Sequence, residues 1–283
     1  MTERVLAFSR VSAEGQTPTR WMILLHGIFG SGGNLRTLAR RLATKQPDWG
    51  FVLPDLRAHG GSLGLPPPDT FEEAAADVER LAAALDHPVH GLAGHSFGGK
   101  VALRVLGRGT MSLERFVLLD SAPGSDPTRM VRDQAGQILS LLEKVDRPIR
   151  SREAFIDAIV SAGHGRAIAE WLAMQVRRAT QVSADVVEYE LRLDLPAIRH
   201  MLEGYFATDL WSTLEDPQPG VRMLVVVGGR STVVNEADRA RLRAAATREP
   251  RMEVSVLERA GHWLHADDLE GLVEVVAPRL ALG

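Results

Sequence analysis

The sequence Gly-His-Ser-Phe-Gly at residues 94–98 decides the fold, because of what stands on either side of it. Residues 88–93 form a short, mostly apolar segment bounded by a proline and a glycine, which predicts a buried strand. Residues 100–106 carry apolar side chains at helical spacing. Ser96 therefore lies in the turn between a strand and a helix. Gly-x-Ser-x-Gly in that context is typical of a nucleophilic serine above a sheet edge, whereas alone it indicates only a glycine-rich turn.

A nucleophilic serine needs an imidazole to take its proton and a carboxylate to orient that imidazole. Residues 251–257 are predicted to form a strand, and His262 follows on the next loop, before a final helix over about 268–280. Open α/β sheets place their chemistry at the carboxyl ends of their strands, so we predict that His262 is the base. We interpret His265 as a rim or packing residue, and we predict no metal site.

The loop after the predicted strand 21–25 reads His-Gly-Ile-Phe-Gly-Ser at residues 26–31. Loops in this position supply a backbone N–H to the oxyanion of the reaction, and here we expect that of Ile28. The second donor is expected to be the N–H of Phe97, which follows the serine. Phe29 flanks these donors, and we predict that it contacts the substrate.

The glycines of this loop could instead indicate a nucleotide-binding site. Such a site would need Gly-x-Gly-x-x-Gly starting at Gly30, but Leu35 stands where the last glycine is required. No Gly-Lys-Ser or Gly-Lys-Thr follows either. We therefore predict no cofactor.

Polar residues also follow the predicted strand 51–54, in the glycine-rich sequence 55–62. Asp55, Arg57 and His59 could suggest a second charge relay. His59 precedes Ser96 in the chain, which is the wrong order for a triad of this kind. We therefore favour a hydrogen-bonded loop that braces the neighbouring loop 26–31.

Four motifs carry a resemblance to a known family: HGIFGS at 26–31, DLRAHGGS at 55–62, GHSFGG at 94–99 and GHWLHAD at 261–267. Together they resemble the α/β-hydrolase superfamily and, within it, are most similar to the YbfF-like bacterial esterases. The similarity runs from about residue 20 to the end of the chain. It implies hydrolysis of carboxylic esters or thioesters, without a cofactor, by the serine and the C-terminal histidine.

The position of the acid in this sequence differs from the commoner pattern of that superfamily, in which an Asp follows soon after strand seven. Here strand seven is predicted at 221–227, and Ser231 stands where the Asp is expected. A hydroxyl cannot stabilise an imidazolium by charge. Strand six, predicted at 115–119, ends beside the serine turn and is followed by Asp120, our predicted acid. YbfF-like esterases resemble this arrangement, which implies that Ser231 supports the histidine. Asp238 is the competitor, and we interpret it as exposed at a helix start.

Alternating predicted strands and helices indicate an α/β fold with a mostly parallel central sheet flanked by helices. Within residues 4–25 we expect a first strand pair that starts antiparallel. Residues 123–219 break the alternation, and we predict a helical cap inserted between strands six and seven. The α/β-hydrolase core would then comprise residues 1–122 and 220–283.

The predicted cap contains four stretches of apolar residues at helical spacing. They lie at 138–142, 155–160, 167–178 and 195–206. Large side chains in the cap could line an acyl pocket, namely Trp171, Met174, Tyr189, Met201, Tyr205, Phe206 and Trp211. Most such residues in a protein are simply core.

Composition excludes several other classes of protein. The chain has 283 residues, 45% of them hydrophobic, which suffices for one sizeable core with an inserted subdomain. Zero cysteines exclude disulfides and a thiol nucleophile, and a net charge of −3 with both signs interspersed gives no basic surface for nucleic acid. The sequence contains no run of about 18 apolar residues, so we predict no membrane span. The N-terminus lacks a signal peptide's apolar core, so we expect a cytoplasmic protein, monomeric or homodimeric.

The expected function is therefore hydrolysis of a small-molecule ester with a short to medium acyl chain, through an acyl-enzyme intermediate. Acyl transfer or perhydrolysis on the same triad is an alternative, in which an alcohol or a peroxide replaces water. A ligand-binding protein of the same shape is a further alternative, since one fold hosts many functions. The presence of serine, histidine and oxyanion loop together disfavours that alternative.

Overall fold

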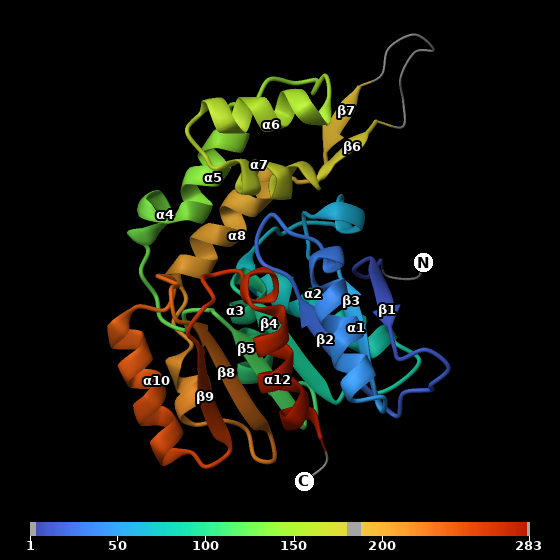
Figure 1. The fold of residues 1–283 in the computed structure, drawn as a ribbon, viewed down its shortest axis with the longest axis vertical. Helices are drawn as coiled ribbons and strands as arrows, with labels where there is room; N and C mark the ends of the chain where they lie inside the picture. The colour runs from blue at the N-terminus through green and yellow to red at the C-terminus, as the bar shows by residue number, and fades with distance from the viewer. Residues whose placement is uncertain (1–3, 180–187, 282–283) are drawn as a thin grey trace.

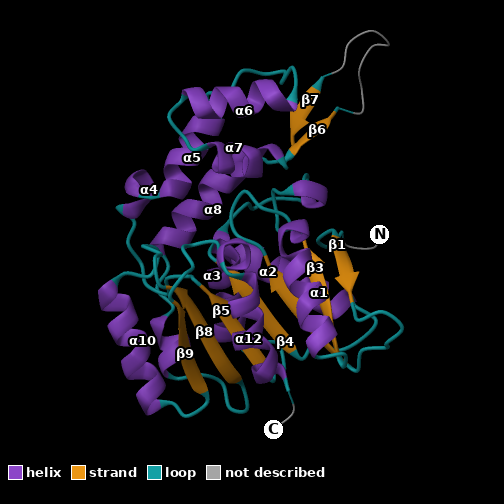
Figure 2. Ribbon diagram, viewed as in Figure 1, coloured by secondary structure: helices purple, strands orange, loops and turns teal. Residues whose placement is uncertain are grey.

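The computed structural model describes residues 4–179 and 188–281, and it contains a central sheet of seven strands (Figures 1 and 2). The sheet order is β1-β3-β2-β4-β5-β8-β9, and every neighbouring pair is parallel except β1 with β3. This confirms the predicted mostly parallel sheet. The strands are β1 (Phe8–Val11), β2 (Arg20–Leu25), β3 (Trp49–Pro54), β4 (Gly91–His95), β5 (Arg115–Leu119), β8 (Arg222–Gly228) and β9 (Met252–Leu257).

The start of the sheet differs from the prediction in two ways. Residues 4–25 contribute only β1 and β2, so the strands numbered six and seven above are the fifth and sixth of this sheet, β5 and β8. The antiparallel partner of β1 is β3, whereas β2 lies on the other side of β3. The segment 12–19 contains Gly15 and Pro18, forms a turn and adds no strand.

Helices cover both faces of the sheet, because alternate residues of each buried strand point to opposite sides. In β2, Met22 and Leu24 belong to one apolar cluster, and Ile23 and Leu25 belong to the other. The first cluster includes α1 (Arg36–Lys45) and α12 (Leu269–Leu280). The second includes α2 (Phe71–Ala84), α3 (Phe97–Arg108) and α10 (Glu236–Arg248). The short elements η1 (Gly32–Leu35), η2 (Gly60–Ser62) and α11 (Leu264–Asp267) lie in the connecting loops.

The register of the parallel strands brings their carboxyl ends to one edge. Leu25 pairs with Gly94, His95 pairs with Leu119, and Leu119 pairs with Val226. The loops after β2, β4, β5 and β8 therefore begin side by side. Sequence motifs that lie far apart in the chain are gathered at this edge by the pairing alone.

The segment between β5 and β8 lies over this edge of the sheet (Figure 1). It contains α4 (Arg129–Arg132), α5 (Gln134–Leu142), α6 (Arg152–Ser161), α7 (Arg166–Ala173), β6 (Val176–Arg178), β7 (Tyr189–Leu191), α8 (Leu195–Ala207) and α9 (Trp211–Glu215). The predicted helix over 167–178 was too long, because its last residues form β6, which pairs antiparallel with β7. Part of the predicted cap, residues 180–187, lies outside the described residues.

Candidate active site

Ser96 lies in the turn between β4 and α3, in a backbone conformation that residues other than glycine rarely adopt. Its φ is 54° and its ψ is −120°, and its N–H donates to the carbonyl of Leu119 at 3.0 Å. Gly94 and Gly98 are required by close backbone approaches: a Cβ on Gly94 would lie 2.3 Å from the Gly98 carbonyl oxygen, and one on Gly98 would lie 2.3 Å from that of His26. Strain of this kind is typical of nucleophile turns.

His262 and Asp120 meet Ser96 at the edge of the sheet. His262, on the loop after β9, has its Nε2 2.9 Å from Ser96 Oγ. Its Nδ1 lies 2.7 Å from Oδ2 of Asp120, which directly follows β5 and is fully buried. The three side chains thus form one continuous chain of hydrogen bonds. The structure brings together the three residues that the sequence analysis selected.

The Asp120 carboxylate is held by the loop after β8 as well as by the histidine. Its Oδ1 accepts a hydrogen bond from the Gly228 N–H at 3.0 Å, and its Oδ2 accepts one from the Ser231 hydroxyl at 2.5 Å. Arg239, which sequence reasoning missed, fixes this loop by donating to the carbonyls of Gly228 and Ser231. Several donors thus satisfy the hydrogen-bonding capacity of this buried carboxylate.

Asp238, the competing carboxylate, does not enter this network. It lies in the first turn of α10, as predicted, and among the described residues it makes no hydrogen bond to His262. The expectation that it is exposed was wrong, because it is half-buried. Burial raises its pKa, although Arg129, Arg241 and Lys100 act in the opposite direction.

The loop after β2 leaves two backbone donors free beside Ser96. The N–H groups of Ile28 and Phe97 have no acceptor within the described residues. The N–H of Phe29, by contrast, donates to His59 Nε2 at 3.1 Å. Phe29 has a φ of 62°, which is unusual for a bulky residue, and its ring lines the cavity at the site.

His26 and His59 act as neutral hydrogen-bonding groups that hold this loop. His26 Nε2 accepts from the Leu56 N–H at 2.9 Å, so its Nδ1 carries the proton and donates to the Gly27 carbonyl at 2.8 Å. His59 Nδ1 donates to the Arg57 carbonyl at 2.7 Å. Burial lowers the pKa of His26 to about 4 and that of His59 to about 3.

The loop 55–62 therefore has the bracing structure that we favoured over a second charge relay. Asp55 accepts hydrogen bonds from the N–H groups of Gly32 and Gly61, at 2.9 and 2.8 Å. Arg57 is buried and makes a bidentate pair with Asp77 of α2, at 2.7 and 3.2 Å. These contacts join the loops after β2 and β3 to the helical layer.

His95 is a positioning residue that the sequence analysis did not identify. Its Nε2 donates to the backbone carbonyl of His262 at 2.7 Å, and the centroids of the two imidazole rings lie 4.7 Å apart. Burial and the neighbouring histidines keep its pKa well below the usual range, so it remains neutral. Only its position beside Ser96 in the motif could have drawn attention to it.

His265 lies against His95, with ring centroids 5.1 Å apart, and it lines the same cavity. Its Nδ1 is buried without a hydrogen-bond partner among the described residues. Burial lowers its pKa to about 4. In the described part of the chain, no group of three His, Cys, Asp or Glu side chains is arranged to hold a metal ion.

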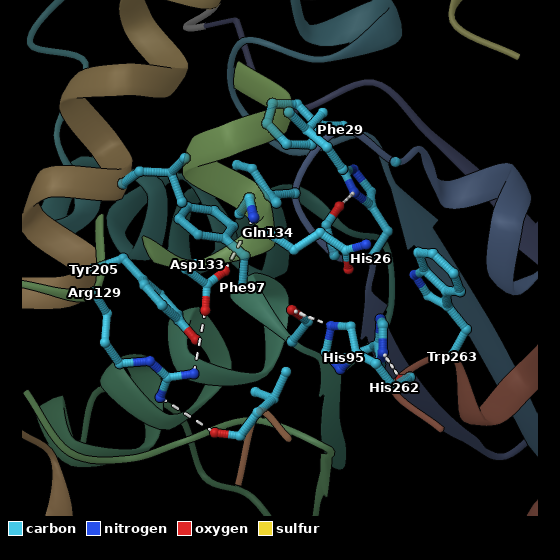
Figure 3. Close-up of a pocket in the computed structure, with 18 of the residues that line it drawn as sticks. His26, Phe29, His95, Phe97, Arg129, Asp133, Gln134, Tyr205, His262 and Trp263 are labelled. Atoms are coloured by element: carbon cyan, nitrogen blue, oxygen red, sulfur yellow. Dashed lines mark hydrogen bonds and ion pairs between the residues drawn. The ribbon is translucent and has the colours of Figure 1, made fainter. Parts of the chain in front are cut away.

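A cavity of about 510 Å³ opens above Ser96 and His262 (Figure 3). Of the large cap residues considered above, Trp171, Tyr205 and Phe206 line it, but Met174, Tyr189, Met201 and Trp211 do not. Apolar side chains form one part of the wall, including Phe29, Phe97, Ile138, Trp171, Leu202 and Phe206. Charged side chains from the region of α4 form another, namely Asp126, Arg129, Arg132 and Asp133.

Lys100, in the first turns of α3, ties the cap to the core. Its Nζ is buried and donates to the carbonyls of Gly124 and Tyr205, both at 2.7 Å. The ammonium also lies 4.6 Å from the centre of the Tyr205 ring. Burial lowers the pKa of Lys100 to about 7, although Asp209 and Asp238 act in the opposite direction.

This lysine predicts a pH dependence of stability. An unfolded chain keeps the ordinary lysine pKa of 10.5, so between pH 7 and 10.5 the unfolded state binds a proton that the folded state lacks. The contribution of Lys100 to stability therefore rises with pH across that window. Relative to Lys100→Met, we expect the wild-type free energy of unfolding to rise by at most about 1.4 kcal/mol per pH unit. Urea unfolding of both proteins from pH 7 to 10 measures this, and parallel curves would contradict it.

Comparison with known proteins shows the family to which the chain belongs. Residues 22–275 match the alpha/beta hydrolase family, and the chain belongs to that family. Among the described residues, no helix is long and apolar enough to cross a membrane.

The relatives of this chain include a lipase and an esterase. The chain is 24% identical to the sn-1-specific diacylglycerol lipase ABHD11 of Mus musculus, over 98% of this chain and 86% of that protein. It is 24% identical to Esterase YbfF of Escherichia coli, over 94% of each chain. The solved structure of a marine microorganism esterase superposes with a TM-score of 0.80 at 21% identity, over 98% of this chain and 99% of that one. That likeness concerns the fold.

Proposed function

We propose that this protein is a carboxylic ester hydrolase that acts through an acyl-enzyme intermediate on Ser96. The hydrogen-bonded chain from Ser96 Oγ through His262 to Asp120, with distances of 2.9 and 2.7 Å, carries the proposal. The names of the relatives, an esterase and a lipase among them, agree with it.

In the first half-reaction, Ser96 Oγ attacks the ester carbonyl while His262 Nε2 takes its proton. Asp120 keeps the other ring proton on Nδ1 and stabilises the imidazolium that forms. The N–H groups of Ile28 and Phe97 hold the oxyanion of the tetrahedral intermediate. The imidazolium then protonates the oxygen or sulfur of the leaving group, which departs as an alcohol or thiol. The acyl group remains bound to Ser96.

In the second half-reaction, neutral His262 takes a proton from water, and the resulting hydroxide attacks the acyl-enzyme. Collapse of the second tetrahedral intermediate returns the proton to Ser96 and releases the carboxylic acid. Ser231 supports this cycle through its hydrogen bond to Asp120. His95 holds the backbone of His262, so the ring keeps its distance from the serine.

We further propose that residues 123–219 act as a cap over a core made of residues 1–122 and 220–283. The cap supplies the part of the cavity wall that would surround an acyl chain, through Ile138, Trp171, Leu202 and Phe206. Phe29 contributes to the same wall from the core side. Apolar walls with a few convergent polar groups are typical of small-molecule sites.

A cavity of this size predicts a preference for short to medium acyl chains. The space of about 510 Å³ must hold the acyl chain together with the leaving group, and its wall of bulky side chains leaves little room for a long chain. We expect kcat/KM for p-nitrophenyl esters to peak between acetyl and octanoyl and to fall towards palmitoyl. The highest kcat/KM on the palmitoyl ester would contradict this.

Trp171 offers a direct test that the cap sets this limit. Trp171 packs against Trp263, with ring centroids 5.7 Å apart, beside the histidine loop. Trp171→Ala should move the optimum to longer chains. Trp21→Ala is the matched control, because Trp21 stacks on His87 and does not line the cavity. Equal shifts in both variants would show that the cap aromatic does not define the acyl site.

A further inference from the structure

A second cavity of about 510 Å³ lies where the paired strands β6 and β7 meet the core. In Figure 1 these two strands lie on the same side of the molecule as β1. The cavity does not include Ser96 or His262, and the mechanism above makes no use of it. The residues that line it are Ala7, Phe8, Ser9, Ser31, Gly33, Arg36, Leu53, Asp55, Gly60, Gly61, Gln175, Arg177, Arg178, Glu190 and Arg192.

The walls of this second cavity carry uncompensated positive charge. Arg36, Arg177 and Arg178 have no carboxylate partner among the described residues, and Arg36 donates only to the Ser9 hydroxyl, at 3.0 Å. The fourth arginine, Arg192, is already paired with Glu190 at 2.9 Å.

The two described acids in the wall form no ion pair with these three arginines. Asp55, the other carboxylate, uses both of its oxygens on the backbone N–H groups of Gly32 and Gly61. Among the described residues that line the cavity, four cations face two anions and give a net positive charge, and the three arginines without a described carboxylate partner have guanidinium groups available to a ligand.

Gln175 provides an independent observation. The residue is only 4% exposed and lines the cavity, and its side-chain amide makes no hydrogen bond within the described residues. The amide is not among the fully buried polar groups that lack a partner, so its polar atoms reach the space of the cavity and can hydrogen-bond a ligand there. In a cavity of net positive charge, the ligand that fits accepts hydrogen bonds and is itself an anion.

We propose that this cavity binds a phosphate group. A guanidinium offers a fork of N–H donors that matches phosphate oxygens, and the described wall holds three guanidinium groups without a carboxylate partner. The Gln175 amide adds a neutral donor. Inorganic phosphate and a phosphomonoester present the same chemistry.

The position of the cavity also links it to the active site. Ser31 and Gly33 line the phosphate cavity, whereas Gly30 and Asn34 of the same loop line the cavity above Ser96. A bound phosphate would therefore lie against the back of the loop that presents Ile28.

Isothermal titration calorimetry on the full chain tests the proposal, with inorganic phosphate and glycerol 2-phosphate as probes at an ionic strength held constant with chloride. We expect saturable binding of at least one probe at a single site. Arg177→Gln and Arg36→Gln should each weaken it by about tenfold or more, because each removes a charge-assisted contact. Arg243→Gln is the matched control: this arginine is exposed on α10 and has no ion pair among the described residues. Its binding should stay within about twofold of wild type.

The two probes separate the sources of the phosphate. Similar affinities would point to free phosphate, and tighter binding of glycerol 2-phosphate would point to a phosphorylated small molecule. Absence of saturable heat with both probes would overturn the proposal, as would an equal loss in Arg243→Gln, which would indicate unspecific charge attraction. Circular dichroism of each variant controls for folding, and Arg177, which is exposed on β6, is the safer of the two substitutions.

Discussion

Ser96→Ala should lower kcat for ester hydrolysis by about 10⁴-fold or more while the fold stays intact. The substitution removes only Oγ, whose hydrogen bond within the described residues is to His262 Nε2. The Cβ remains, so the unusual backbone conformation of the turn is retained at no additional cost. Turnover of a chromogenic ester such as p-nitrophenyl butyrate measures the loss, and circular dichroism with thermal unfolding checks the fold.

Ser140→Ala is the matched control for this experiment. Ser140 lies in α5, donates to the Gly136 carbonyl and does not line the cavity above Ser96. It should keep full activity. If Ser96→Ala retained more than about a tenth of the wild-type rate, the nucleophile assignment would be wrong. Mass spectrometry of wild type quenched during turnover should find the acyl group on the peptide that contains Ser96, which a binding protein without turnover would not show.

The core of the fold could be predicted because its signals are local. The strand before Ser96 and the helix after it each show their own periodicity, and β5 was predicted with the bounds that the structure has. Once these strands are placed in one parallel sheet, their carboxyl ends must meet. Asp120 and His262 could therefore be selected from their positions after strands, although they are 142 residues apart.

Features that depend on distant contacts could not be predicted in this way. Val176 continues the apolar spacing of α7, so a helix was expected there, but pairing with Leu191 makes it part of a strand. Asp238 has the local pattern of an exposed helix start, and only packing near Lys100 half-buries it. The contact of His95 with the His262 carbonyl joins residues 167 positions apart and leaves no local signal.

The second large effect is expected at the acid. Asp120→Asn should lower kcat by about 10²–10⁴-fold with little change in KM. Oδ1 of Asp120 accepts from the Gly228 N–H, so the oxygen of the introduced amide must stay on that side. The NH₂ group of the amide would then take the place of Oδ2 and donate to His262 Nδ1. The ring proton would move to Nε2, where it blocks removal of the proton from Ser96.

Two further variants distinguish the loss of tautomer control from a general disturbance of the site. Ser231→Ala removes a neutral hydroxyl that donates to the carboxylate, a contact worth about 0.5–1.5 kcal/mol, and should cost about tenfold in kcat. Asp238→Asn should be nearly silent, since that carboxylate shares a separate cavity with Lys100. A pH profile adds a readout that packing damage would not move: Asp120→Asn should alter the ionisation that controls kcat, whereas Ser231→Ala should scale the whole profile. Should Asp238→Asn prove the damaging change, the acid would have to be reassigned, even if Ser96 remains the nucleophile.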